Sequence, residues 1–257
     1  MTASNDALRS GASYWWRSYL MMSRWELTNL RLVLPVTVMA QVLSGAGFVL
    51  GVGLFFDRVP DRAALFVSTG VLVITLVLVG MILGPQLIAQ QKYDQTYDFM
   101  WSLPIPRATA ALAWVTTNMI IAVPGMAVAV AVAVWRYDLP LEISPSVVPA
   151  VLLVLVTGTM VGYALAHVIG NPLLMQLITQ VTIFVIIGFS PINFPIDQLP
   201  GWLQAIHQWL PFHPMAVVTR AGLTVGVVDD VPRAYLVLAL WTVAATAATG
   251  WVLSRRK

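Results

Sequence analysis

Residues Gln176–Arg220 read QLITQVTIFVIIGFSPINFPIDQLPGWLQAIHQWLPFHPMAVVTR. The stretch begins as an apolar segment that is long enough to enter a bilayer, and it breaks at Ser190–Pro191. Five prolines follow between Pro191 and Pro214, with a short amphipathic segment, Trp202–Leu210, among them. Irregular backbone at membrane depth survives only where protein or a water-filled cavity satisfies its polar groups. The pattern therefore predicts short re-entrant helices over residues 190–220 that plug or rim one end of a helical bundle.

The composition assigns the whole chain to the membrane. Of its 257 residues, 59% are hydrophobic and only 10% are charged, and the mean hydropathy is +0.82. A soluble domain carries about a quarter charged residues, so this chain lacks the polar surface to face water on all sides. It contains no cysteine, which excludes disulfides, thiolate metal sites and a cysteine nucleophile. We expect an all-α polytopic membrane protein.

Six apolar stretches have the length of about 20 residues that a hydrocarbon core of about 30 Å requires. They are Leu32–Phe56, Ala63–Ala89, Ala108–Trp135, Val147–Ile169, Leu173–Phe189 and Ala234–Leu253. No internal repeat and no Ser/Gly-rich linker divides the chain. We therefore expect one membrane domain over residues 1–257, with six transmembrane helices.

The segment before the first span is amphipathic in pattern. Within Tyr14–Leu32, Arg17, Arg24 and Arg31 recur every seven residues and so share one helical face, while Trp, Leu and Met side chains occupy others. A basic face opposite a Trp/Leu face is typical of a helix that lies in the membrane interface. The alternative is a solvated helix that packs on a soluble partner, and the pattern leaves both open.

The distribution of basic residues predicts the orientation. With six spans both termini lie on one side, and that side also holds the Gln90–Arg107 segment between the second and third spans. Nine Lys and Arg residues fall there, against five on the other side. An excess of basic residues marks the cytoplasmic side, so we expect cytoplasmic termini and an external Gln176–Arg220 break. The first thirteen residues lack the apolar core of a cleaved signal peptide.

Small and polar residues inside the spans predict helix contacts. Three small-xxx-small pairs would allow close approach, namely Gly47/Gly51, Gly80/Gly84 and Gly158/Gly162. On the fifth span, Gln176, Gln180 and Phe184 follow one another at four-residue intervals and can point into the bundle. There they would either line a pathway or join helices. No acidic residue and no lysine lies at the centre of a span, which argues against a proton relay or ion-coupled carrier.

Motifs for chemistry on this chain are missing. The only lysines are Lys92 and Lys257, and neither follows a phosphate-binding glycine loop, so we expect a non-catalytic subunit without its own ATPase. The histidines are scattered, and no metal site is expected. Ser190 offers an alternative, an intramembrane serine hydrolase, but no histidine is placed to activate its hydroxyl. The simpler interpretation is a serine that caps a helix end.

The polar segment Gln91–Arg107 reads QKYDQTYDFMWSLPIPR. It resembles the cytoplasmic coupling segment of type-two ABC exporter permeases. Thr96, Asp98, Phe99, Met100, Pro104 and Arg107 fall in register with that family's pattern, whereas Gln91 and Gln95 depart from it. A short helix whose apolar and aromatic side chains (Tyr97, Phe99, Met100, Trp101) face the cytoplasm suits docking into a groove on a soluble partner. The alternative is a surface loop at the lipid interface.

The opening stretch carries a second resemblance to the same family. Its external segment after the fifth span has a proline-broken helix end, short re-entrant helices and a single arginine. The matching positions here are Pro191, Phe194, Pro195, Leu199, Pro200, Trp202 and Arg220. With the N-terminal helix and the six spans, the two motifs cover nearly the whole chain.

This resemblance implies the permease subunit of an ATP-driven exporter in a cell membrane, such as the bacterial inner membrane. A second permease subunit, identical or related, would complete a dimer. Separate ABC ATPase subunits would bind ATP and Mg, so this chain would carry no cofactor. The cargo would be hydrophobic or amphipathic, such as a drug, an antibiotic or a lipid, and multidrug efflux would be one such role. It would pass between the fifth and second spans of facing subunits. A non-transporting membrane assembly or sensor subunit is the alternative; nucleic acid is not an expected partner.

Overall fold

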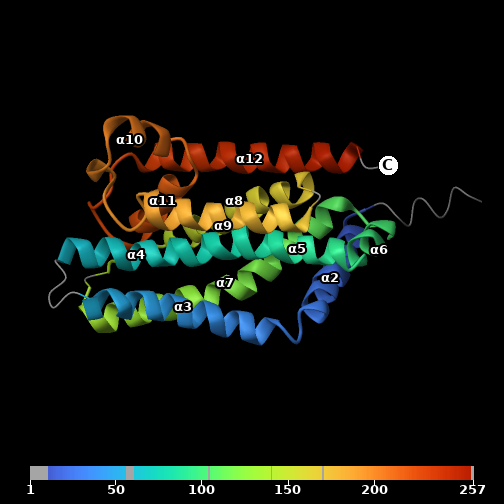
Figure 1. Cartoon of the computed structure of the whole chain (residues 1–257), viewed down its shortest axis with the longest axis horizontal. Helices are drawn as coiled ribbons and strands as arrows, with labels where there is room; N and C mark the ends of the chain where they lie inside the picture. Colours follow the sequence, from blue (N-terminus) through green and yellow to red (C-terminus); the bar gives the residue numbers. More distant parts are fainter. Residues whose placement is uncertain (1–10, 56–60, 104, 140, 170, 256–257) are drawn as a thin grey trace, which may run out of the picture.

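The computed structural model describes residues 11–55, 61–103, 105–139, 141–169 and 171–255, and within these ranges the regular structure is helical without strands (Figure 1). The elements are α2 (Ala12–Asn29), α3 (Leu34–Phe55), α4 (Asp61–Val77), η1 (Leu78–Leu83), α5 (Gly84–Tyr93), α6 (Thr96–Ser102), α7 (Arg107–Tyr137), α8 (Val147–Val168), α9 (Pro172–Phe189), η2 (Ile196–Gln198), α10 (Gly201–His207), α11 (Phe212–Leu223) and α12 (Val231–Arg255). The predicted all-α class is confirmed.

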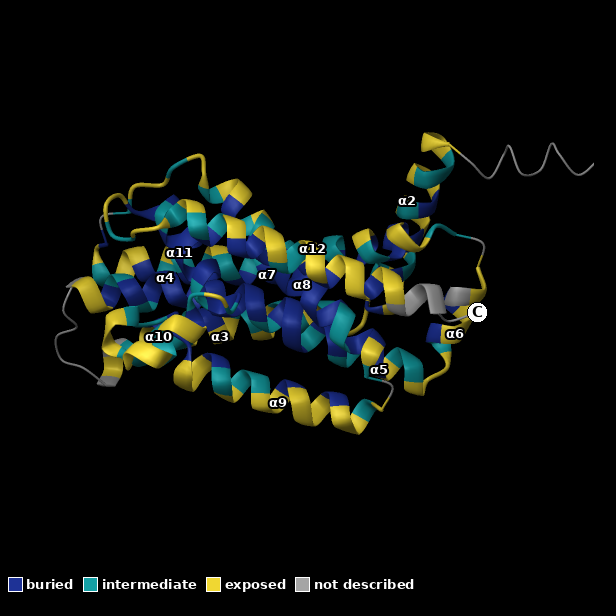
Figure 2. Cartoon of the chain, turned by 90° about the horizontal axis from the view of Figure 1, so that it is seen from above, coloured by how far each residue is buried: buried dark blue, intermediate teal, exposed yellow. Residues whose placement is uncertain are grey.

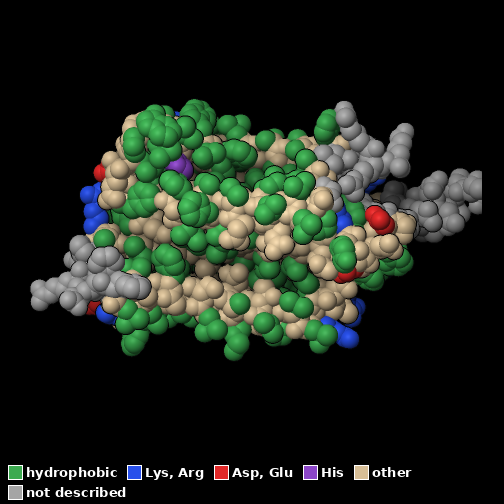
Figure 3. All heavy atoms as spheres, in the orientation of Figure 1, with side chains coloured by type: hydrophobic (Ala, Val, Ile, Leu, Met, Phe, Trp, Pro, Cys, Tyr) green, Lys and Arg blue, Asp and Glu red, His purple; other side chains and the backbone are tan. Residues whose placement is uncertain are grey.

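Six of the described helical stretches are long and apolar enough to cross a membrane, as predicted. They are Leu34–Val52, Arg62–Tyr93, Arg107–Tyr137, Val147–Val168, Pro172–Phe189 and Val231–Trp251. They run along the long axis of the molecule (Figure 1). The face seen in Figure 3 is covered by hydrophobic and uncharged side chains, and the coloured charges gather towards its two ends. This distribution fits a bilayer around the middle of the bundle.

The second span is a composite of α4, η1 and α5. It continues four residues beyond the predicted end at Ala89, so that the polar residues from Gln90 to Tyr93 belong to its last helical turn. Residues Leu78–Leu83 form a π-helical segment that the sequence pattern did not indicate. Segments of this kind widen a helix locally and are frequent at functional sites.

The core lies where the second span meets α8 and α11. Leu76 of α4, Leu155 of α8 and Met215 of α11 are all fully buried in one hydrophobic cluster. The second span is the most buried of the six, whereas α3 and α9 are the least buried. Figure 2 shows α9 at one edge of the bundle with most of its surface exposed. Large parts of the outer spans are thus available to lipid or to partner proteins.

Close backbone approach replaces hydrophobic collapse as the main source of helix–helix contact, because lipid tails are as apolar as the side chains they surround. A Cβ atom added to Gly80 would lie 2.8 Å from the carbonyl carbon of Gly158, and one added to Gly162 would lie 2.2 Å from the carbonyl oxygen of Gly80. The second and fourth spans therefore touch through glycine. The Gly47/Gly51 pair differs from the prediction, since added Cβ atoms there would meet nothing within 4 Å.

Interhelical hydrogen bonds add to this packing. The Nδ2 of Asn118 on α7 donates to Oγ1 of Thr159 on α8 at 3.1 Å. The hydroxyls of Thr157 on α8 and Thr242 on α12 lie 2.7 Å apart. Such bonds contribute about 0.6 kcal/mol each in a membrane protein. They fix the rotation of α8 between its two neighbours.

Candidate functional site

Helix α6 lies between the second and third spans, in the segment predicted to couple to a partner. It follows a left-handed residue, Gln95, whose φ is 59° and which turns the chain out of α5. The two sides of α6 differ. Tyr97 and Met100 are buried, with 3% and 6% of their surface exposed, whereas Asp98 is exposed and Phe99 keeps 54% of its surface exposed.

The buried side of α6 belongs to a cluster that joins four other helices. Tyr97 and Met100 pack in one hydrophobic group with Met22 of α2, Ile88 of α5, Trp114 of α7 and Tyr163 of α8. The rings of Tyr97 and His167 are 5.6 Å apart. The sequence interpretation counted Tyr97 and Met100 among the docking side chains, but their burial makes them the anchor of α6. Among the described side chains of α6, Phe99 is the exposed aromatic one.

The other residues of the predicted coupling segment frame α6. Thr96 begins the helix and is half-buried, and Arg107 is exposed as the first residue of α7. Arg107 and Met100 line a surface cavity of about 170 Å³ beside the helix. Pro104 and the side chain of Trp101 lie outside the described residues. Phe99 is braced from behind by Trp25 of α2, with ring centroids 5.7 Å apart.

Helix α2 supports α6 and runs at an angle to the bundle (Figure 2). Arg17 and Arg24 are exposed on it. Arg31, which the spacing grouped with them on one helical face, lies just beyond the end of α2, in the turn that leads to the first span, and is also exposed. The helix buries a stripe of Ser18, Met22 and Glu26 instead of either aromatic face.

Glu26 is a buried acid that the sequence interpretation missed. Its side chain is 3% exposed, and its Oε2 accepts a hydrogen bond from Nε2 of Gln91 at 3.2 Å. Burial raises the pKa of Glu26 to about 7, and the hydrogen bond from Gln91 opposes that rise. The signal in the sequence was the four-residue spacing of Ser18, Met22 and Glu26, which places them on one face. Two of these three side chains, Ser18 and Glu26, are polar, so the sequence pattern does not mark this face as buried.

A lateral cavity of about 770 Å³ opens beside α5 and α9, near the end of the bundle that carries α6. Amide side chains dominate its polar lining, and none of its described lining residues is charged. The polar lining residues are Gln86, Gln90, Tyr93, Asn171 and Gln176. The Nε2 of Gln86 donates to Oγ1 of Thr179 at 2.9 Å, which ties the second span to the fifth across the cavity wall.

The exposed face of α9 carries Gln176, Gln180 and Phe184. All three are exposed, Phe184 with 68% of its surface. The sequence interpretation allowed them to point into the bundle. The structure differs, because α9 instead buries Met175, Thr179 and Ile186 against its own chain. The stripe therefore faces away from the chain's own helices, towards lipid, a cavity or another subunit.

At the opposite end, the predicted re-entrant segment forms η2, α10 and α11. Pro191 is buried, Phe194, Pro195 and Leu199 are half-buried, and Pro200 and Trp202 are exposed, Trp202 with 68% of its surface. Ser190 ends α9, and its N–H donates to the carbonyl of Val185. Its hydroxyl is buried without a hydrogen-bond partner among the described residues.

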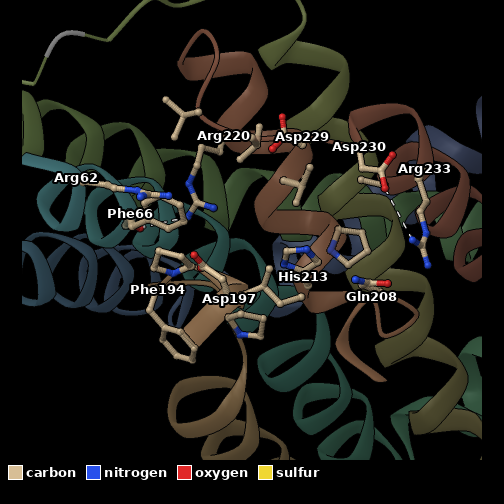
Figure 4. Close-up of a pocket in the computed structure, with 18 residues that line it drawn as sticks. Arg62, Phe66, Phe194, Asp197, Gln208, His213, Arg220, Asp229, Asp230 and Arg233 are labelled. Atoms are coloured by element: carbon tan, nitrogen blue, oxygen red, sulfur yellow. Dashed lines mark hydrogen bonds and ion pairs between the residues drawn. The ribbon is translucent and has the colours of Figure 1, made fainter. Parts of the chain in front are cut away.

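Arg220 of α11 ties this end of the molecule together. Only 2% of its surface is exposed. Its Nε donates to Oγ1 of Thr69 at 2.9 Å, and its Nη2 donates to the carbonyls of Phe66 and Ile192 at 3.3 and 2.8 Å. One side chain thus connects α4, the turn after α9, and α11. Figure 4 shows this guanidinium beside Phe66 at a pocket.

The arrangement defines a multi-pass α-helical membrane protein with a braced helix at one end and a folded-back segment at the other. Among the residues that the structure describes, no three His, Cys, Asp or Glu side chains gather as a metal site requires. Residues 27–251 match the family described as ABC-2 family transporter protein, and the chain belongs to that family. It is therefore the membrane permease component of an ABC transporter. Permeases of this family associate with ABC ATPase subunits. No curated protein shows a significant match to the chain.

Proposed function

We propose that the chain is the permease subunit of an ATP-driven exporter, and that α6 is where a separate ATPase subunit docks. The observation that carries this proposal is the two-sided character of α6. Phe99 is 54% exposed beside the exposed Asp98, while Tyr97 and Met100 anchor the same helix in the core. An exposed aromatic side chain on a rigid base is a suitable anchor for a groove on a partner.

A push on α6 reaches the spans through the cluster behind it. Tyr97 and Met100 share one hydrophobic cluster with residues of α2, α5, α7 and α8, so a displacement of α6 would be passed on to these helices. In addition, the Nζ of Lys92 on α5 donates to the carbonyls of Ala166 and Ile169 at the end of α8. ATP and Mg would bind the partner ATPase, and this chain would contribute no cofactor site.

The lateral cavity at α5 and α9 supplies the access for cargo in this proposal. Its lining has amides and a tyrosine but no charge, which favours a hydrophobic or amphipathic molecule with hydrogen-bonding groups. The amides of Gln176 and Gln180 also argue for a second permease subunit opposite α9, because amide side chains exposed to lipid are unfavourable. The cargo would then pass between the two subunits.

An exporter of this kind has a defined orientation in the membrane. Helices α2 and α6 would lie in the cytoplasm, and the segment of residues 190–220 would form the external gate. The excess of basic residues on the side of the termini supports this orientation. Gate opening would require the re-entrant helices to separate from α4, to which Arg220 ties them.

Co-purification tests the docking site. The tagged chain is expressed with the ATPase subunit it recruits, and the ATPase recovered per permease is measured. The double change Asp98→Lys with Phe99→Ala should lower the recovery by about tenfold or more, because anchoring aromatics carry about 2 kcal/mol or more of binding energy. Membrane insertion should be unchanged.

Trp135→Ala is the matched control, since Trp135 is an exposed aromatic side chain at the other end of α7, with 78% of its surface exposed. It should leave the recovery unchanged. Normal recovery with the double variant would show that α6 is not the docking site.

A further inference from the structure

A cavity of about 380 Å³ lies at the end of the bundle opposite α6, where α4, the turn after α9, α11 and the start of α12 meet. Its lining includes three arginines and three aspartates, namely Arg62, Arg220, Arg233, Asp197, Asp229 and Asp230. Figure 4 shows these side chains around the opening. So many charges in one cavity contrast with the uncharged cavity at α5 and α9.

Arg220 lies at the buried base of this cavity, and none of the described carboxylates serves as its counter-ion. Its three hydrogen bonds go to neutral oxygens, those of Thr69, Phe66 and Ile192. No carboxylate of the described residues lies within ion-pair distance of it, since their one such pair joins Arg233 and Asp230. An arginine keeps its charge in a protein, and a buried charge is costly unless it is paired.

A second arginine converges on the same place. The guanidinium carbon of Arg220 lies 4.0 Å from the centroid of the Phe66 ring, and that of Arg62 lies 5.9 Å from it. Arg62 is exposed on α4. Both arginines line the same cavity, so an anion bound there would be attracted by two cations. Planar guanidinium groups are well matched to phosphate oxygens.

The aspartates limit which anion fits. Asp230 is engaged by Arg233 at 3.8 Å, which leaves Asp197 and Asp229 at the wall against Arg62 and Arg220. Among the described residues, none of these four groups forms an ion pair. Two cations and two carboxylates in one cavity suit a phosphate that also carries a positive charge. Exposed Trp202 and Trp209 on the neighbouring segment, with 68% and 58% of their surface exposed, place this end at the membrane–water boundary, where lipid headgroups lie.

We propose that this cavity is a binding site for a phosphate group, with Arg220 and Arg62 as its two cationic contacts, and that it favours a zwitterionic phosphate such as phosphocholine. The site is separate from the cargo access at α5 and α9. The proposal does not depend on the direction in which cargo is transported. Its occupant would neutralise Arg220, the residue that ties α11 to α4, so occupancy would stabilise the folded-back segment.

Calorimetric titration of the full-length chain in a nonionic maltoside detergent, in a buffer free of phosphate and sulfate, tests the proposal. The probes are inorganic phosphate, glycerophosphocholine and dihexanoylphosphatidylcholine below its micelle concentration. Arg62→Gln should weaken binding by about fivefold, the range for one exposed charge. Arg220→Lys, which keeps the charge but loses the fork of donors, is a second variant with the same expected direction.

Arg136→Gln is the control, because Arg136 is an exposed arginine at the end of α7 that does not line the cavity. Binding of any probe that Arg62→Gln weakens and Arg136→Gln does not supports the site. Binding of inorganic phosphate then indicates that the free anion suffices, and binding of the lipid alone identifies a headgroup as the source. Failure of all three probes to bind, or equal effects of the two Arg→Gln changes, overturns it.

Discussion

The contact between the second and fourth spans can be tested by a substitution that adds a single methyl group, Gly162→Ala. In Gly162→Ala the new Cβ would lie 2.2 Å from the carbonyl oxygen of Gly80, 2.9 Å from Cγ of Pro85 and 3.0 Å from Cα of Met81. Two of these three atoms belong to the backbone, so no side-chain rotation can relieve the clash. An ordinary contact begins at 3.4 Å, and the two helices would have to separate by about 1 Å.

Overpacking a well-packed contact costs about 1–3 kcal/mol, and Gly162→Ala should reach the upper end of that range because backbone must move. For a chain of this size about 3 kcal/mol corresponds to a midpoint lower by roughly 6–12 °C. Thermal unfolding in detergent, followed by the fluorescence of the ten tryptophans, measures it. Midpoints are compared at a single scan rate, because membrane proteins commonly unfold irreversibly.

Gly158→Ala is the matched control on the same face of α8. Its added Cβ would meet only Cγ of Met81, at an ordinary 3.7 Å. Since alanine also favours a helix by up to about 1 kcal/mol over glycine, this variant should unfold at or above the wild-type temperature. Midpoints of the two variants within about 2 °C of each other would refute the close approach of Gly162 to Gly80.

Two further predictions concern the two ends of the bundle. Burial raises the pKa of Glu26 from 4.5 to about 7, so stability falls as the pH rises from 4.5 through 7, and one pKa unit corresponds to about 1.4 kcal/mol. Glu26→Gln should therefore be more stable than wild type by up to about 3 kcal/mol at pH 8 and similar to it at pH 5; unfolding curves of parallel pH dependence for the two proteins would contradict the burial of this acid. The chain has no cysteine, so Trp202→Cys should react with a membrane-impermeant maleimide on intact cells and Ser102→Cys only after permeabilisation. The opposite pattern would reverse the proposed orientation.

The sequence alone was sufficient for the class, the number of spans and the regions at both ends that contain short helices. Hydrophobic length is a local property: about 20 apolar residues span a bilayer regardless of which helices they meet. Proline and polar residues likewise end a helix through local chemistry, and for this reason α6, α10 and the helix end at Phe189 were placed close to where the structure has them.

Which side of a short helix faces the core could not be derived in the same way. In α6, Tyr97, Phe99 and Met100 are equally plausible as docking side chains, and only the positions of α2, α7 and α8 bury two of them and leave Phe99 exposed. For Gln176 and Gln180 the sequence allowed a position inside the bundle. They are exposed instead, because α9 packs on the bundle through Met175 and Thr179. Burial depends on all the neighbours at once, and a seven-residue helix has too few turns to reveal its buried side by periodicity.

The sequence determined by itself that this is an all-α membrane protein of six spans with a proline-broken segment at residues 190–220, because length, hydropathy and proline act locally. Only the tertiary structure decided what that segment does with Arg220. The sequence shows one arginine in a largely apolar stretch. The fold brings Thr69 and Phe66 of α4 and the carbonyl of Ile192 around it. Its charge lies at the base of a cavity, and no carboxylate among the described residues pairs with it. Contacts between residues about 150 positions apart in the chain are set by helix packing, and no local pattern encodes them.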